Sequence, residues 1–163
     1  MKKIIATALI IGLGFSAAHA ETTTKKDFSV AVGTSTAMGS SSEMEYKLGY
    51  GVTKYFDSGI MAGVNFEVGL MNGEKENNYD YSGNVKVGFS PIKNGAVYGI
   101  GSAIYQSIGT EISGYGFGYG AGVEYRITDS FAAAVEYKTY SMTLESGIDY
   151  DYDNTSAVLK YTF

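Results

Sequence analysis

The residues of this chain that could do chemistry are charged side chains at alternate positions, within stretches where apolar and polar residues alternate. A period of two indicates β-strands, whose successive side chains point to opposite faces. On this alternation five cations and four carboxylates share the polar face. They are Lys47, Lys86, Arg126, Lys138 and Lys160, opposed by Glu67, Asp80, Glu124 and Glu136.

The near balance of these charges predicts a network of ion pairs. An unpaired charge in a narrow interior is strongly unfavourable, so we expect a paired and hydrogen-bonded network rather than a charged ring that selects ions. Arg126 has a planar group with five donors. We therefore predict that Arg126 is the hub of the network, with Glu124 and Glu136 as its partners.

The stretch Tyr115–Ile127 shows which kind of protein would hold such a network. It reads YGFGYGAGVEYRI, with aromatic and aliphatic residues on one face and four glycines, Glu124 and Arg126 on the other. A core-facing strand of a soluble sheet normally opposes bulky side chains rather than a row of glycines. The pattern is typical of a small closed barrel in lipid, with an apolar exterior and a narrow polar interior.

The rest of the chain repeats this pattern. After a polar leader, Glu21–Lys26, it divides into eight alternating segments of about ten residues, the length that a tilted transmembrane strand needs. We therefore predict an all-β fold, an eight-stranded antiparallel up-and-down transmembrane β-barrel. In the fifth segment the expected outward residues are Tyr98, Ile100 and Ile104, and the expected inward residues are Gly99, Gly101 and Ala103.

The connections between the segments are expected to alternate in length. Short turns are predicted near Asp57, Asn94 and Asp129, and longer polar loops at Thr36–Met44, Asn72–Asn78, Gly109–Gly114 and Met142–Tyr150. The stretch Asp149–Asp153 begins like a calcium loop but lacks its glycine and closing glutamate. We interpret it as a solvated acidic loop, and divalent-cation binding there stays an open hypothesis.

The first twenty residues have the features of a secretory signal peptide. Lys2 and Lys3 precede an apolar run, and Ala18 and Ala20 form a small-x-small cleavage site. The expected domains are a signal peptide, 1–20, and a barrel, 21–163; a membrane anchor is disfavoured because the run is short. Cleavage would remove the only histidine, and the chain has no cysteine.

This composition excludes several functions. Without His or Cys the mature chain lacks the usual metal ligands and general bases, so we expect no metal, no cofactor and no enzymatic activity. The Gly116-x-Gly118-x-x-Ala121 motif has no strand-to-helix context, which argues against nucleotide binding. A net charge of -5 and a pI near 4.8 argue against a nucleic-acid partner.

The signal peptide, the alternating segments and the C-terminal Tyr161-Thr162-Phe163 resemble the small outer-membrane β-barrel proteins of Gram-negative bacteria, the OmpA/OmpX-like group. The resemblance implies that Leu159, Tyr161 and Phe163 form the signal read by the barrel-assembly machinery. It also implies a monomer in the outer membrane, in contact with lipid and lipopolysaccharide. The chain has no Trp, so the expected interfacial belts are tyrosines: Tyr46, Tyr79, Tyr81, Tyr115 and Tyr137.

The sequence thus predicts a barrel with a largely plugged polar lumen, acting as a surface, envelope-integrity or adhesion-type protein through extracellular loops that could touch a host or surface ligand. The alternative is a small non-specific pore. A secreted lipocalin-like carrier would need an apolar interior, and therefore the opposite phase of the alternation.

Overall fold

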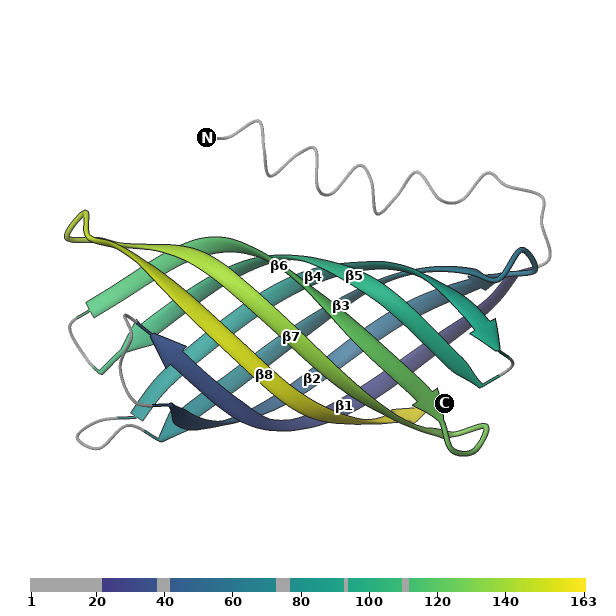
Figure 1. The fold of residues 1–163 in the computed structure, drawn as a ribbon. Helices are drawn as coiled ribbons and strands as arrows, with labels where there is room; N and C mark the ends of the chain where they lie inside the picture. The colour runs from purple at the N-terminus through teal and green to yellow at the C-terminus, as the bar shows by residue number, and fades with distance from the viewer. Residues whose placement is uncertain (1–21, 38–41, 73–76, 93, 110–111) are drawn as a thin grey trace.

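Eight antiparallel strands form a closed barrel in the computed structural model, which describes residues 22–37, 42–72, 77–92, 94–109 and 112–163 (Figure 1). The predicted fold is confirmed. The predicted signal peptide, with Ala18 and Ala20, lies outside the described residues. Within these ranges no helix is long and apolar enough to cross a membrane. The strands are β1 (Thr22–Ala37), β2 (Glu43–Phe56), β3 (Ile60–Asn72), β4 (Asn77–Ile92), β5 (Gly95–Ile108), β6 (Ile112–Arg126), β7 (Phe131–Leu144) and β8 (Asp149–Thr162).

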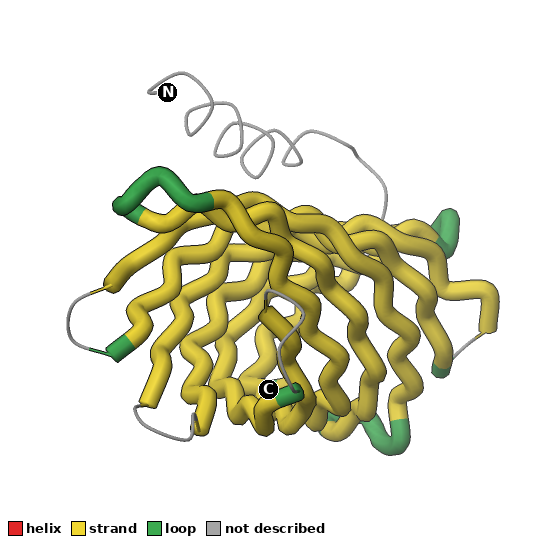
Figure 2. Tube along the Cα trace, turned by 60° about the vertical axis from the view of Figure 1, so that its left-hand side comes forward, coloured by secondary structure: helices red, strands yellow, loops and turns green. Residues whose placement is uncertain are grey.

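Each strand pairs with its neighbours in sequence, and β1 closes the barrel against β8. Strands make up nearly all of the described chain, and short connections join them at the two ends (Figure 2). Following cross-strand partners once around the barrel from Lys26 leads back to β1 at Thr36, ten positions farther along the strand. With a rise of about 3.3 Å per residue and strands about 4.7 Å apart, this stagger gives a strand tilt of about 40°. That tilt is typical of transmembrane barrels.

The barrel has two distinct ends. The start of β1 and the end of β8 lie at one end of the barrel, which we call the terminal end (Figure 1). The turns after β2, β4 and β6 lie at this end as well. The connections after β1, β3, β5 and β7 lie at the opposite end, which we call the distal end. The outward residues of most strands are large, apolar and exposed, whereas the inward residues are buried.

The phase predicted for β5 is wrong. Tyr98, Ile100 and Ile104 are each only 4% exposed and face the lumen, whereas Gly99, Gly101 and Ala103 face outward. The reason lies in the neighbouring strand, because Tyr98 pairs with Gly122 and Ile100 with Gly120. The inward glycines of β6 leave space that the bulky inward residues of β5 fill.

The predicted leader and long loops are also wrong. Residues 22–26 belong to β1, so the leader is part of the barrel wall. At the distal end the connections are only three to five residues long, comparable with the turns at the terminal end. Backbone pairing continues there, as between Thr36 and Asp153, because a ladder outside lipid does not need an apolar exterior.

The acidic stretch is likewise strand rather than loop. In β8, Tyr150 and Tyr152 point inward and are buried, while Asp149 and Asp151 are exposed on the outer wall. Across the ranges that the structure describes, no group of three or more His, Cys, Asp or Glu side chains is arranged to hold a metal ion.

Candidate functional site

The candidate site is the set of charged side chains that the strands send into the lumen. Eight of the nine predicted residues are buried there, each at most 7% exposed. They come from six strands, β2, β3, β4, β6, β7 and β8, each of which presents alternate residues to the interior: Lys47, Glu67, Asp80, Lys86, Glu124, Glu136, Lys138 and Lys160. The ninth, Arg126, is only half-buried.

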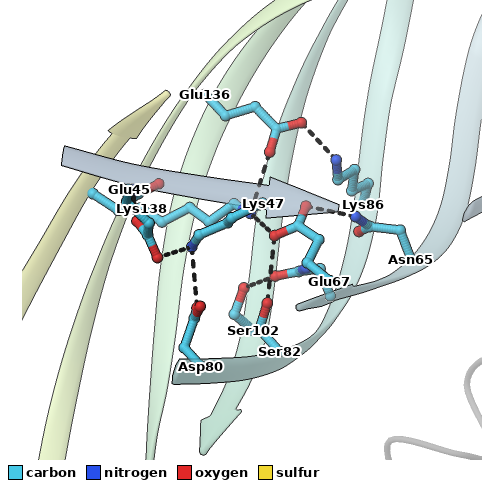
Figure 3. Close-up of polar contacts among 12 residues, drawn as sticks. Glu45, Lys47, Asn65, Glu67, Asp80, Ser82, Lys86, Ser102, Glu136 and Lys138 are labelled. Carbon is cyan, nitrogen blue, oxygen red and sulfur yellow. Dashed lines mark hydrogen bonds and ion pairs between the residues drawn. The ribbon is translucent and has the colours of Figure 1, made fainter. Parts of the chain in front are cut away.

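The centre of the lumen holds a chain of alternating charges (Figure 3). Lys138 Nζ lies 2.7 Å from Glu67 Oε2 and 3.3 Å from Glu136 Oε2. Glu136 Oε1 accepts from Lys86 Nζ at 2.5 Å and from the Tyr98 hydroxyl at 2.8 Å. Glu136 is therefore the carboxylate that joins two lysines, and it fills part of the role predicted for Arg126.

A second pair lies nearer the terminal end. Lys160 Nζ is 2.5 Å from Glu124 Oε2, and the Tyr55 hydroxyl donates to Glu124 Oε1 at 3.2 Å. The Tyr98 ring connects this pair to the central chain, because Lys86 and Lys160 lie 5.3 and 5.5 Å from its centroid. Cation–π contacts of this kind strengthen when the cation is desolvated.

A third cluster lies nearer the distal end. Lys47 Nζ is 3.0 Å from Glu45 Oε1 and 3.2 Å from Asp80 Oδ2, so one lysine serves two carboxylates (Figure 3). Glu45 also accepts from Ser35 at 2.5 Å, from the Tyr152 hydroxyl at 2.9 Å and from Asn154. These contacts tie β1, β2, β4 and β8 together across the lumen.

Sequence reasoning missed two buried carboxylates, Asp27 and Glu45, which are 8% and 1% exposed. Both continue the alternation of the inward-facing residues in their strands. The sequence-based prediction missed them because Asp27 borders the predicted leader and Glu45 borders a predicted loop. The available signal was the alternation itself, since Glu45 is two residues before Lys47.

The charge balance in the lumen changes as a result. Four buried lysines face six buried carboxylates, because Asp27 and Glu45 join the set and Arg126 leaves it. The predicted near balance is therefore wrong, and the lumen carries two surplus carboxylates. Such a surplus favours cations or protons over anions in the interior.

The prediction that Arg126 is the hub is wrong. Its guanidinium carbon lies 5.2 Å from the centre of the Tyr55 ring at the terminal mouth, and it makes no ion pair with any residue that the structure describes. Its predicted partners, Glu124 and Glu136, are bound by lysines. Lysines reach farther into the lumen from β4, β7 and β8, whereas Arg126 is the last residue of β6.

Two apolar layers flank the charged network. The distal layer consists of Met71, Ile104, Tyr140, Met142, Leu144, Tyr150 and Tyr152. The terminal layer consists of Met61, Ala96, Tyr98 and Ile100, with Tyr55 packed against it. The central chain of charges thus lies between these two groups of packed side chains, and the Lys160–Glu124 pair lies among the residues of the terminal layer.

The outer wall carries an aromatic belt at the terminal end. The Phe28 ring lies 5.4 Å from Tyr50 and 5.5 Å from Phe163, and Phe131 lies 5.2 Å from Tyr161. The predicted assembly-signal residues are part of this wall, where their side chains are exposed: Leu159, Tyr161 and Phe163.

The apolar band of the outer wall, which includes this belt, has unequal heights around the barrel. At about 2.5 Å of axial rise per residue, the outward apolar residues from Tyr115 in β6 to Ile127, just after its end, span about 30 Å. Those from Phe131 to Tyr137 in β7, and from Ala157 in β8 to Phe163 just after its end, span only about 15 Å. A transmembrane barrel normally has an apolar band about 25 Å tall.

On β7 and β8, where the apolar band is short, polar residues occupy the distal part of the outer wall. We call this surface, on the distal half of β7, β8 and β1, the polar outer face. It consists of Thr34, Thr36, Thr139, Ser141, Thr143, Asp149, Asp151, Asp153 and Thr155. Two of its carboxylates are hydrogen-bonded, Asp149 to Thr143 at 2.8 Å and Asp153 to Tyr137 at 3.1 Å. The predicted belt tyrosine Tyr137 thus marks the border of this face.

Comparison with known proteins settles the family. The family model of the outer membrane protein beta-barrel domain matches residues 5–163. The chain belongs to this family. The predicted resemblance is confirmed, and the outer membrane is the location that the family implies. A search of curated proteins found no match.

Solved structures show the same fold at low sequence identity. Neisserial surface protein A aligns with a TM-score of 0.60 at 11% identity, over 88% of this chain and 99% of that protein. Ail, the attachment invasion locus protein of Yersinia pestis, aligns with a TM-score of 0.59 at 14% identity, over 86% and 97%. The outer membrane enzyme PagL aligns with a TM-score of 0.55 at 15% identity, over 83% and 98%.

Proposed function

We propose that this protein acts at the cell surface, as an envelope-integrity or adhesion-type barrel whose lumen is plugged. The observation that carries the proposal is the lumen itself, where buried ion pairs join the strands between two packed apolar layers. A hydrated ion could pass only by separating pairs such as Lys86–Glu136 and Lys138–Glu67. Leaving such charges unpaired away from bulk water is strongly unfavourable.

The plugged lumen moves the expected activity to the outer wall and the distal end. Outer-membrane barrels place their chain termini in the periplasm, so we assign the distal end to the cell exterior. The exterior contacts are then made less by long loops than by strand ends and the polar outer face. Proposed partners are outer-membrane lipid, lipopolysaccharide and a host or surface ligand. During biogenesis, the barrel-assembly machinery would read Leu159, Tyr161 and Phe163, and the folded protein would be a monomer.

Two of the structural neighbours support a surface role. One is a surface protein and another an attachment invasion locus protein, but at 11–14% identity they share only the fold. PagL is an enzyme on the same fold. We propose that the present chain is not, because after removal of the predicted signal peptide it would contain neither His nor Cys.

A small pore is the second candidate, and one observation favours it. Six buried carboxylates against four lysines would make any conducting path through this lumen selective for cations. The two functions can therefore be distinguished by conductance: a plugged barrel carries no steady current, whereas a pore carries a current that is selective for cations.

Conductance of the refolded mature chain in planar bilayers tests the proposal. We expect no steady current from the wild type. Glu136→Ala, which removes the carboxylate between Lys86 and Lys138, should admit an intermittent current, whereas Val135→Ala on the outward face should stay silent. A steady, cation-selective current in the wild type would refute the plug and establish the pore.

Complementation of a strain lacking the gene tests the surface role separately. We expect a triple variant of the polar outer face, with Asp149, Asp151 and Asp153 replaced by Asn, to lose detergent resistance or surface attachment. As a control, the conservative variant Lys160→Arg, whose change lies in the lumen, should restore both properties to the deletion strain as the wild type does. If the triple variant complements as well as the wild type, the polar outer face is not the working surface.

A further inference from the structure

The terminal mouth of the barrel contains a polar pocket that the proposed function does not use. Its volume is about 470 Å³, and its walls include Lys25 of β1, Tyr55 of β2, Ser90 of β4 and Arg126 of β6, with Asp57 from the turn after β2. These residues lie at the terminal end of the barrel, at about the level of the aromatic belt, where Phe163 N donates to Lys26 O and Ile127 N to Phe131 O.

Two cations of this pocket have no carboxylate partner. Neither Lys25 nor Arg126 makes an ion pair with the residues for which side chains are described, although both stand among the pocket walls. The nearest lumen carboxylate on β6, Glu124, is already bound by Lys160 and by the Tyr55 hydroxyl. Among the described residues that line the pocket, Asp57 is the one acid, so these residues together carry a net positive charge.

The arginine is held in place rather than free in solvent. Its guanidinium carbon lies 5.2 Å from the Tyr55 ring centre, and Tyr55 is itself fixed by its hydrogen bond to Glu124. Stacking on an aromatic face leaves the edge of a guanidinium available, and this edge matches the geometry of carboxylate and phosphate oxygens. A fixed guanidinium and an ammonium group that line the same pocket are a suitable arrangement for an oxyanion.

We propose that the terminal mouth is an anion-binding site that takes a phosphate or carboxylate group through Arg126 and Lys25. The group could belong to a phospholipid headgroup in the adjoining leaflet or to a soluble molecule on the terminal side. Binding does not depend on whether the lumen conducts, because the pocket lies outside the charged network.

The chain offers an unusually clean reporter for this site. Arg126 is its only arginine, so the side-chain Nε–H gives a single assignable NMR signal in the refolded mature chain. We expect inorganic phosphate to shift this signal saturably in zwitterionic micelles. Lys25→Gln should weaken the apparent affinity about threefold or more, the effect of one accessible ion pair, while Lys26→Gln, the same charge change on the outward face, should leave it unchanged.

Nanodiscs distinguish the two sources of the anion. A shift in phosphatidylglycerol discs but not in phosphatidylcholine discs supports a lipid headgroup, whereas a shift with added phosphate in phosphatidylcholine discs supports a soluble ligand. No saturable shift under either condition would overturn the proposal, and so would equal weakening by Lys25→Gln and Lys26→Gln. Heat-modifiable electrophoretic mobility verifies that each variant is folded.

Discussion

Removing the Lys138 side-chain charge should destabilise the barrel mainly through Glu67. Lys138 is 1% exposed and lies within ion-pair distance of both Glu67 and Glu136. In Lys138→Met, Glu136 keeps Lys86 at 2.5 Å and the Tyr98 hydroxyl at 2.8 Å. Among the residues that the structure describes, Glu67 keeps only neutral hydrogen-bond donors, Asn65 at 2.7 Å and Ser82 at 3.4 Å.

The expected loss follows from this difference. Removing one partner of a buried pair costs about 3–5 kcal/mol, because the other charge stays buried without compensation. Neutralising the stranded carboxylate should recover a large part of that loss. We therefore expect Lys138→Met/Glu67→Gln to be clearly more stable than Lys138→Met alone, and Lys138→Met/Glu136→Gln to recover little, because Lys86 would then lose its own partner.

Reversible urea unfolding in lipid vesicles, followed by circular dichroism, gives the free energies of unfolding for these variants. Lys54→Met, at a lysine near the terminal end outside the buried network, is the control for loss of a positive charge. A loss below about 1 kcal/mol for Lys138→Met would mean that the pair is solvated like a surface ion pair. Equal rescue by both glutamine substitutions would refute the assignment of the stranded charge to Glu67.

Two further predictions concern the walls of the barrel. A Cβ at Gly122 would lie 2.5 Å from the Tyr98 ring, which is held by its hydrogen bond to Glu136, so Gly122→Ala should cost about 1–3 kcal/mol of unfolding free energy. Gly101→Ala, with open space outside, should cost much less, and equal losses would contradict the packing of β5 against β6. The chain has no cysteine, so single spin labels at Thr155 and Tyr119, which lie at about the same height, can report the polar outer face. The Tyr119 label should be more accessible to oxygen and the Thr155 label to a water-soluble nickel complex; matching accessibilities would mean that lipid covers both faces equally.

The amino-acid sequence by itself determined the fold class and most of the site. Alternation with a period of two, repeated eight times, is enough to predict strands that close into a barrel, because an open sheet edge has no hydrogen-bond partners in lipid. The same alternation placed Lys47, Glu67, Asp80 and other charged residues on the inner face without any knowledge of their contacts. This worked because each lies in a segment whose opposite face is plainly apolar.

The tertiary structure decided the phase of β5 and the pairing of the charges. Both faces of the β5 segment carry apolar residues, Val97 on one face and Tyr98, Ile100 and Ile104 on the other. The alternation is therefore compatible with either phase. The choice depends on the glycines of the neighbouring strand, which lie beside β5 only after folding. Which lysine meets which carboxylate depends in turn on the stagger of the strands, which brings residues from distant segments to the same height.

The positions of the strand ends could not be predicted from the sequence either. Polar residues such as Thr36 and Asp153 look like loop residues, yet their backbones pair across the seam between β1 and β8. Once the lipid-embedded part of the barrel fixes the register, backbone hydrogen bonds extend the ladder regardless of side-chain polarity. The sequence therefore determines where the wall must be apolar, and only the closed barrel determines how far the wall continues.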